Sequence, residues 1–230
     1  MTMNKKIRDD CANRGITRLC HFTPSRNLLH VLNSGYLKDR QTLDMEASDE
    51  VNPTDAYRRD GHLDKICCSV EYPNSYYLDI VKRKELIFLD WVILFIDPEV
   101  LWSPGTLFCP RNAAAENGAL IESGWPGFES MFAPQSQGAR GLIFRRQSSH
   151  LPCSPTDLQA EVLVPGPIPI EAIQGLAMLT EKQVHTERAR WDALGLSPLM
   201  VPTVVAPDLF DKITLKDQIW AGRRPTETAV

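Results

Sequence analysis

A single carboxylate at the head of an apolar run is the first feature of this sequence that could do chemistry. Glu161 lies in the stretch PTDLQAEVLV, where Val162, Leu163 and Val164 follow it and Pro165 ends the run. This pattern predicts a buried strand. Burying an unpaired carboxylate is costly, so Glu161 must be either solvated at the end of the strand or held by partners. Glu161 is therefore the leading catalytic candidate, and the alternative is an edge glutamate that faces water.

The elements expected earlier in the chain would position further polar side chains. Residues 16–22 predict a strand that ends in HFT, and TPS then supplies a cap and a proline for a helix that Gly35 ends. The later pattern predicts a polar surface excursion over 38–64, strands at 66–70, 86–96 and 176–179, a turn at 71–74, a loop with a helical turn over 112–127 and a charged helix over 181–194.

Composition bounds the class of protein. The chain of 230 residues has 25 basic and 29 acidic residues, a net charge of −4, so a polyanionic partner would need a local basic patch. Length and pattern indicate one domain over 1–230, with a core at about 16–180 and a helical or irregular extension over 181–230.

The compartment and the absence of a metal are also expectations from composition. Six cysteines without paired CxxC spacing indicate reduced thiols in a cytoplasmic protein. Metal dependence is not expected, because the sequence shows no cluster of metal ligands. The charged N-terminus and the absence of a long apolar run make secretion and membrane insertion unexpected.

A basic segment directly precedes the strand that carries Glu161. Residues 135–150 contain Arg140, Arg145, Arg146 and His150 and no acidic residue. Such a run is usually a solvated face, but arginines there can also meet phosphates.

Several motifs then follow one another in a set order: LCHFTPSRNLLHVLNSG, RRDGHLDKICCSVEYPNSYY, NAA at 112–114, GFESMF, RG at 140–141 and PTDLQAEVLV. This order resembles the DarT family of DNA ADP-ribosyltransferases, the toxins of toxin–antitoxin systems, over roughly residues 16–179. The runs CxSxxxPN and PTDxQAEVLV are similar to the branch of the family that modifies guanine, whereas the thymine-directed branch would typically have a Pro-Arg-Ser-Pro-Met run.

The resemblance implies an α+β fold with the split β-sheet of ADP-ribosyltransferases and flanking helices, with NAD⁺ as the co-substrate. A base of single-stranded DNA would be the acceptor, and a DarG-like macrodomain antitoxin would reverse the modification. Breaking the bond between nicotinamide and ribose passes through an oxocarbenium-like cation. By the resemblance, Glu161 is the catalytic glutamate that would offset this charge, bind a ribose hydroxyl and take a proton from the base.

The resemblance also assigns residues that would bind NAD⁺. His21 matches a histidine that would hold a ribose hydroxyl or the nicotinamide amide, although a lone His in an apolar strand is more often a core residue. Thr23 and Asn27 would contact the nicotinamide side, with helix capping as the alternative. The remaining candidates for the nicotinamide pocket are Ser69, Tyr72 and Tyr76, of which the two tyrosines could instead be packing residues.

Two further groups complete the implied site. Arg58 matches an arginine near the NAD⁺ phosphates or the reacting centre; a slip to Arg59 and a solvated loop arginine are the alternatives. The loop that selects the acceptor corresponds to residues 135–154. Its candidates for binding nucleic acid are Arg140, Phe144, Arg145, Arg146 and His150, joined by Asn112 of the NAA turn, which could equally be structural.

The acceptor stays open at this level, because fold does not fix it. Thymine in DNA, RNA and protein are alternatives to guanine, and an inactive nucleic-acid-binding module is an alternative to an enzyme. The presence of both His21 and Glu161 favours the enzyme.

Overall fold

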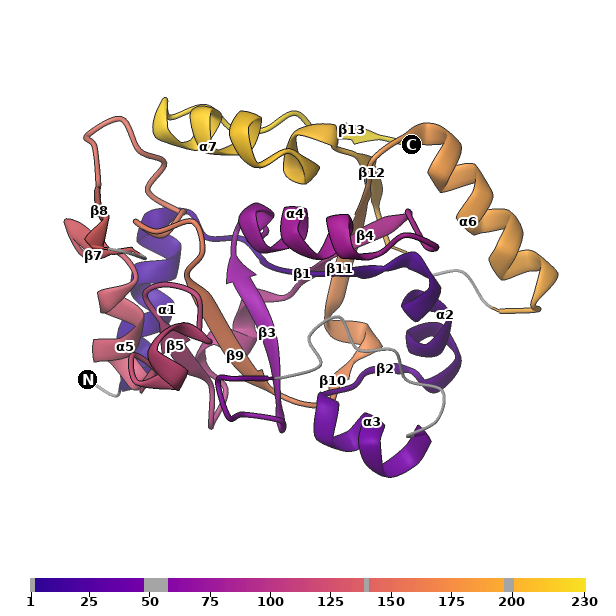
Figure 1. The fold of residues 1–230 in the computed structure, drawn as a ribbon, viewed down its shortest axis with the longest axis horizontal. Helices are drawn as coiled ribbons and strands as arrows, with labels where there is room; N and C mark the ends of the chain where they lie inside the picture. Colours follow the sequence, from indigo (N-terminus) through magenta and orange to yellow (C-terminus); the bar gives the residue numbers. More distant parts are fainter. Residues whose placement is uncertain (1–2, 48–57, 139–140, 197–200) are drawn as a thin grey trace.

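A computed structural model of the chain describes residues 3–47, 58–138, 141–196 and 201–230 (Figure 1). The fold is α+β and is built on one nine-stranded sheet. In spatial order the strands are β13 (Thr228–Ala229), β12 (Thr203–Val205), β11 (Ile173–Met178), β4 (Trp91–Ile96), β1 (Leu19–Pro24), β3 (Lys65–Val70), β9 (Glu161–Pro165), β5 (Leu107–Cys109) and β6 (Glu122–Ser123). Two smaller pairings join β2 (Tyr36–Leu37) to β10 (Ile168–Pro169) and β7 (Gln135–Gln137) to β8 (Ile143–Arg145).

Helices flank this sheet (Figure 1). The α-helices are α1 (Met3–Arg14), α2 (Ser25–Ser34), α3 (Arg40–Ala47), α4 (Ser75–Lys84), α5 (Gly124–Ser130), α6 (Glu181–Ala193) and α7 (Lys212–Trp220). Short 3₁₀ turns are η1 (Pro98–Trp102), η2 (Ala115–Gly118), η4 (Ile170–Ala172) and η5 (Pro207–Phe210). Helices α1 and α5 pack together beside β5, while α4 packs against α7.

The sheet splits between its two central strands, β1 and β3. They pair at Leu19 with Val70 and at Cys20 with Ser69. Beyond this point β1 continues along β4 as far as Pro24, whereas β3 runs along β9. The two halves therefore diverge from His21 onward, and the split-sheet class predicted from the sequence is confirmed.

The core lies around β4, whose six residues from Trp91 to Ile96 are all buried. This strand is covered by β1 on one side and by β11 on the other, both antiparallel. A strand enclosed in this way carries a continuous apolar run and no alternation of polar residues. It anchors the half of the sheet from which His21 projects.

Helix α2 forms where the sequence predicts it. Leu28 and Val31 are buried on its inner face, and Gly35 ends it in the left-handed conformation, with φ of 75°. The Gly35 amide donates to the Val31 carbonyl at 2.9 Å, which satisfies one of the last carbonyls of the helix.

The apolar run at 86–96 differs from the prediction of one long strand. Only the second half is β4; Leu86, Ile87 and Leu89 are exposed, because the Glu85 carboxylate accepts hydrogen bonds from the amides of Ile87 and Phe88 and holds the chain in a turn. Helix α4, which follows the predicted turn at 71–74, was not predicted.

Two stretches differ from their predictions: the surface excursion over 38–64 and the helical or irregular extension over 181–230. Within 38–64, α3 and the buried side chains of Asp39 and Asp60 belong to the folded body. The extension after residue 181 contributes β12 and β13 to the sheet, with β12 parallel to β11. Such pairings between distant segments leave no local pattern in a sequence.

The sequence analysis also made predictions about the state of the cysteines and about membrane insertion. All six cysteines are free, and five of them are buried. Within the described ranges no helix is long and apolar enough to cross a membrane.

Candidate active site

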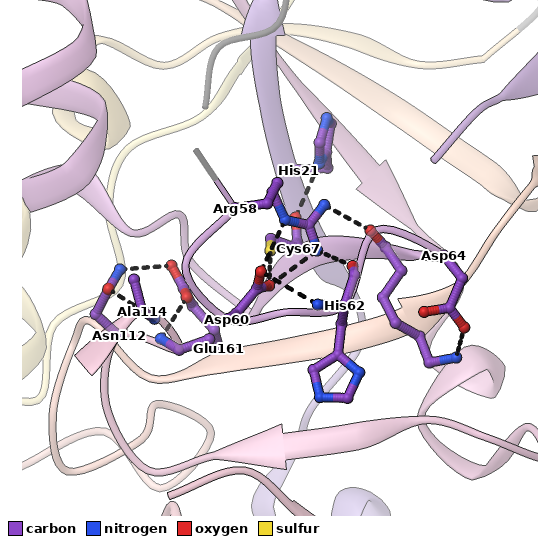
Figure 2. Close-up of polar contacts among 11 residues, drawn as sticks. His21, Arg58, Asp60, His62, Asp64, Cys67, Asn112, Ala114 and Glu161 are labelled. Carbon is purple, nitrogen blue, oxygen red and sulfur yellow. Dashed lines mark hydrogen bonds and ion pairs between the residues drawn. The ribbon is translucent and has the colours of Figure 1, made fainter. Parts of the chain in front are cut away.

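The carboxylate of Glu161 is buried, and Figure 2 shows it beside Asn112 and Ala114, next to the separate polar network around Arg58 and Asp60. Its Oε1 accepts hydrogen bonds from the side-chain amides of Asn74 and Asn112, each at 3.1 Å. Its Oε2 accepts from the backbone amide of Ala113 at 2.7 Å. An ionised carboxylate accepts at both oxygens, so these three donors suit it. The sequence left open whether Glu161 is solvated at the end of its strand or held by partners, and in the structure it is held by partners.

Three elements bring these donors to Glu161. The glutamate begins β9 and lies in register with Cys109 of β5. Asn74 is the N-cap of α4, where its Oδ1 accepts from the amide of Tyr77 at 3.0 Å. The Asn112 to Ala114 turn is closed by the Asn112 Oδ1, which accepts from the Ala114 amide at 3.1 Å.

A cavity of about 350 Å³ opens beside Glu161, where the two halves of the sheet diverge. Its walls come from β1, α2, α3, β3, the start of α4 and the Asn112 to Ala114 turn. The candidates from the sequence that line it are His21, Thr23, Asn27, Arg58, Ser69, Asn112 and Glu161. A concave site lined by a few convergent polar groups has the form of a small-molecule site.

His21 bridges the split in the sheet. Its Nδ1 lies 2.9 Å from the carbonyl oxygen of Cys67 on β3. Burial lowers the pKa of His21 below 6.5, and the nearby Arg58 lowers it further. A carbonyl only accepts, so the neutral ring carries its proton on Nδ1 and leaves Nε2 as an acceptor. A neutral His21 can therefore receive a hydrogen bond from a hydroxyl.

Thr23 and Asn27 contact each other across the first turn of α2. The Asn27 amide donates to the Thr23 hydroxyl at 2.9 Å. The N-cap position of α2 is Pro24, which makes no side-chain capping bond. The two polar side chains therefore lie on the cavity wall and do not cap the helix.

Arg58 organises the loop that precedes β3 (Figure 2). Its guanidinium makes a forked pair with Asp60, with Nε to Oδ1 at 3.0 Å and Nη2 to Oδ2 at 2.8 Å, and donates to the carbonyls of Lys65 and His62. The neighbouring Arg59 is exposed and does not line the cavity. Of the two arginines considered from the sequence, Arg58 is the one that lies at the cavity.

A family model described as ssDNA thymidine ADP-ribosyltransferase, DarT, matches residues 20–211, which includes every cavity element named above. The chain belongs to the DarT family. It is thus an NAD⁺-dependent DNA ADP-ribosyltransferase by family, as the sequence motifs predict, and NAD⁺ is its co-substrate.

Solved structures share the fold of this DarT chain at low sequence identity. One is Thermus sp. 2.9 DarT in complex with NAD⁺, with a TM-score of 0.54 and 15% identity over 85% of this chain and 98% of that one. Thermus sp. 2.9 DarT in complex with ADP-ribosylated ssDNA gives 0.52 and 14% over 86% and 97%. Thermosipho africanus DarTG in complex with ADP-ribose gives 0.54 and 12% over 84% and 51%. A comparison with curated proteins found no match.

The tyrosines of this DarT chain lie differently from the sequence prediction. Tyr72 is buried and, like Tyr76, is not among the residues that line the cavity. Helix α4 starts at Ser75, and its first turn brings Tyr77 to the cavity, where its ring packs against Phe22 with centroids 6.1 Å apart. Phe22 and Tyr77 therefore form an aromatic pair in the cavity wall, which Tyr36 of β2 also lines.

The basic segment forms the β7–β8 hairpin and the loop after it. Arg140 lies outside the described residues, and Arg145 on β8 is exposed. Phe144 is half-buried and packs over Gly138, where an added Cβ would lie 2.5 Å from its ring. The Ser136 hydroxyl donates to the Pro110 carbonyl at 3.3 Å, which attaches the hairpin close to the Asn112 turn.

Two residues of this segment have structural contacts instead of a free surface. The Arg146 guanidinium donates to the carbonyls of Ser154, Leu151 and Pro152 at 2.8, 2.9 and 3.1 Å. His150 is buried, and burial lowers its pKa to about 4. The structure therefore does not present the His150 ring for stacking on a base.

Sequence reasoning assigned no role to Asn74 or to the Ala113 amide, although both hold Glu161. A Pro-Asn pair before an apolar stretch is a recognisable helix start, and this signal would have indicated the cap. No sequence pattern indicates that the side-chain nitrogen of Asn74 would face the carboxylate of Glu161, which is 87 residues away in the chain. Among the described residues no cluster of three or more metal-ligand side chains is found.

Proposed function

We propose that this protein is a toxin that transfers ADP-ribose from NAD⁺ to guanine in single-stranded DNA and releases nicotinamide. The observation that supports this most is the Glu161 carboxylate, held by three hydrogen-bond donors in a cavity that it shares with a neutral His21. A fixed negative charge suits a reaction that develops positive charge on a ribose. A reaction between NAD⁺ and DNA would take place in the cytoplasm, where both are found.

The proposed step breaks one bond and forms another. The bond between the ribose C1′ and the nicotinamide nitrogen breaks, and its electron pair leaves with nicotinamide. A nitrogen of the base then attacks C1′, and the proton that this nitrogen loses is accepted by Glu161. The carboxylate also offsets the charge on the ribose in the transition state.

The remaining cavity residues would bind NAD⁺ in this scheme. The Nε2 of His21 would accept from a ribose hydroxyl. Phe22 and Tyr77 would form an apolar face for the nicotinamide ring, with Thr23 and Asn27 at its amide. The guanidinium of Arg58, which is held in place by its two-point ion pair with Asp60, would contact the diphosphate of NAD⁺.

The β7–β8 hairpin would meet the acceptor strand. Arg140 and Arg145 would contact phosphates, and Phe144 would stack on an unpaired base, with Asn112 at the boundary between the hairpin and the cavity. A base edge is accessible only outside the duplex, so single-stranded DNA is the expected substrate.

Guanine is proposed over thymine because of the CxSxxxPN run. Its members Cys67, Ser69 and Asn74 all line the cavity, and Asn74 binds Glu161. The family model that matches the chain is described by thymidine, so thymine is the alternative base.

The base is tested by mass spectrometry of short single-stranded oligonucleotides, each lacking one base, after incubation with NAD⁺ and the protein. We expect an ADP-ribose adduct on every oligonucleotide except the one without guanine, and no adduct with Glu161→Ala. An adduct that requires thymine would keep the reaction and change the base. No adduct on any DNA would contradict DNA as the acceptor and direct the assay to RNA and protein; no nicotinamide release with any acceptor would favour an inactive binding module.

A toxin of this kind is expected to be paired with a macrodomain antitoxin that removes the modification. Expression of the intact chain without such a partner should slow bacterial growth, and Glu161→Ala should restore it. Unimpaired growth at a matched level of intact protein would contradict the role as a toxin.

A further inference from the structure

Besides accepting the Leu78 amide of α4 at its carbonyl, at 3.0 Å, Asn74 makes three hydrogen bonds that link helix α4, strand β3 and Glu161. Its backbone amide donates to the Ser69 hydroxyl at 2.9 Å, and its Oδ1 accepts from the Tyr77 amide at 3.0 Å. Its Nδ2 donates to Oε1 of Glu161 at 3.1 Å. The side chain is buried, with 1% of its surface exposed. Asn74 is thus both the cap of a helix and a direct partner of the carboxylate.

The helix fixes which end of the Asn74 amide faces Glu161. The Tyr77 N–H is a donor, so the oxygen of the Asn74 amide must point toward the first turn of α4. The nitrogen then points the other way, toward Oε1. The amide cannot flip without losing the cap and turning its oxygen on the carboxylate, so α4 holds the donor in place.

We propose that Asn74 is a positioning residue of this reaction: capping of α4 locks its amide, and the locked amide keeps the Glu161 carboxylate turned toward the cavity. The inference rests on the function proposed above. Asn112 also donates to Oε1, but from a turn, so Asn74 is the donor that couples the carboxylate to a helix and to its residue Tyr77. Both Asn74 and Tyr77 line the cavity, so the first turn of α4 carries both the amide that holds the carboxylate and the ring proposed to face nicotinamide.

Capping and positioning can be separated by substitution, because Ser and Asp cap helices about as well as Asn. Asn74→Ser keeps an acceptor for the Tyr77 amide but is too short to reach Glu161. Asn74→Asp keeps the cap and the shape but replaces the donor by an oxygen that faces Oε1. Asn4→Asp is the matched control: it adds the same charge at an exposed residue that donates to the Trp102 carbonyl, away from the cavity.

The test measures nicotinamide release from NAD⁺ with single-stranded DNA, together with the KM for NAD⁺ and the unfolding midpoint of each variant. We expect kcat to fall about 10-fold in Asn74→Ser and about 100-fold in Asn74→Asp, which corresponds to losing a hydrogen bond to a charged group and adding repulsion. The KM for NAD⁺ should stay close to that of the intact chain in both variants. The unfolding midpoint should stay close in Asn74→Ser and fall at pH 8 in Asn74→Asp, where a second buried carboxylate faces Glu161. Asn4→Asp should match the intact chain throughout.

The pH profile distinguishes positioning from a structural effect. Relative to the intact chain, Asn74→Asp should recover activity from about pH 8 to about pH 5.5, because the introduced carboxyl group, once protonated, regains a donor for Glu161. Asn74→Ser should not recover. The other titratable and charged groups that line the cavity are common to all variants and cancel in this ratio: the histidines and carboxylates His21, His30, Asp39, Glu46 and Asp60, the cations Lys38, Arg40, Arg58 and Lys65, and the thiols Cys20, Cys67 and Cys68.

Two results would overturn the inference. One is unchanged kcat in Asn74→Ser; the other is a loss of kcat that runs parallel to a lower unfolding midpoint, without pH recovery in Asn74→Asp. If the intact chain releases no nicotinamide with any acceptor, the proposed function fails separately. Crystal structures of the intact chain and Asn74→Ser then decide: a Glu161 carboxylate that rotates away from the cavity supports the inference, and one that stays on Asn112 and Ala113 contradicts it.

Discussion

Among single residues, the charged and polar groups at the cavity divide into those that a sequence motif can indicate and those that it cannot. Glu161 begins an apolar strand and His21 lies within another, and in both places a polar side chain is unexpected and therefore informative. Asn74 looks like an ordinary helix cap, and its second contact depends on the tertiary fold. Tyr77 was missed for a related reason, because which of two adjacent tyrosines faces inward depends on the start of α4 at Ser75.

The protonation state of His21 gives a prediction at this scale. Its pKa is lowered by burial and by Arg58, so the ring stays neutral to a lower pH than a free histidine would. We expect kcat/KM for NAD⁺ to be flat as pH falls from about 8 to about 6.5, and to decline only below that range. A decline centred at or above the ordinary histidine pKa of 6.5 would contradict a buried neutral ring.

At the scale of elements, the sheet could be predicted better than the segments that close the cavity. Strands β3 and β9 and helix α2 have clear apolar patterns. Helix α6 is charged, and its signals are the Thr180 cap and the glycine that follows it, Gly195. The run 86–89 has the composition of a strand, but the Glu85 carboxylate binds its amides and turns it outward. Helix α3 has a polar sequence, and its position depends on Asp39, which accepts from the Thr42 amide at 2.9 Å and from its hydroxyl at 2.8 Å.

Gly166 tests how closely α3 is held against the sheet. A Cβ at this position would lie 2.4 Å from Oδ2 of Asp39, so Gly166→Ala must displace the residue that caps α3. We expect a raised KM for NAD⁺ and a loss of about 1–3 kcal/mol in the free energy of unfolding. Gly175→Ala is the control, because its Cβ would crowd Phe95 at 3.1 Å, away from the cavity. It should lower stability with little change in KM; equal effects on KM would argue against a role for α3 in binding.

For the whole molecule, the C-terminal segment belongs to the same sheet as the cavity, and local patterns gave no sign of this. Ion pairs tie the segment to the start of β1 and the end of β3. Arg18 makes a forked pair with Glu227, and Arg224 lies 3.1 Å from the buried carboxylate of Glu71. These contacts are remote in sequence, so no window of residues indicates them.

The ion pair between Arg224 and Glu71 should contribute to the stability of the fold and not to the reaction. Arg224→Ala leaves the Glu71 carboxylate with its hydrogen bonds from Thr17 but without the cation. Since Arg224 is more than half exposed, we expect a modest loss of about 1 kcal/mol in the free energy of unfolding by urea, and unchanged kcat. Arg223→Ala, at the exposed neighbouring residue, should have no effect on either quantity. A fall in kcat with Arg224→Ala would instead connect the segment to the reaction.

The held carboxylate of Glu161 is the group that we propose drives the cleavage of NAD⁺. The most direct measurement is the rate of nicotinamide release with single-stranded DNA for the intact chain, for Glu161→Gln and for Glu129→Gln, an exposed control that removes the same charge. We expect Glu161→Gln to lose about 100-fold or more in kcat, with an unfolding midpoint near that of the intact chain, and Glu129→Gln to lose nothing. Nicotinamide release that persists in folded Glu161→Gln at the rate of the intact chain would contradict this role of Glu161.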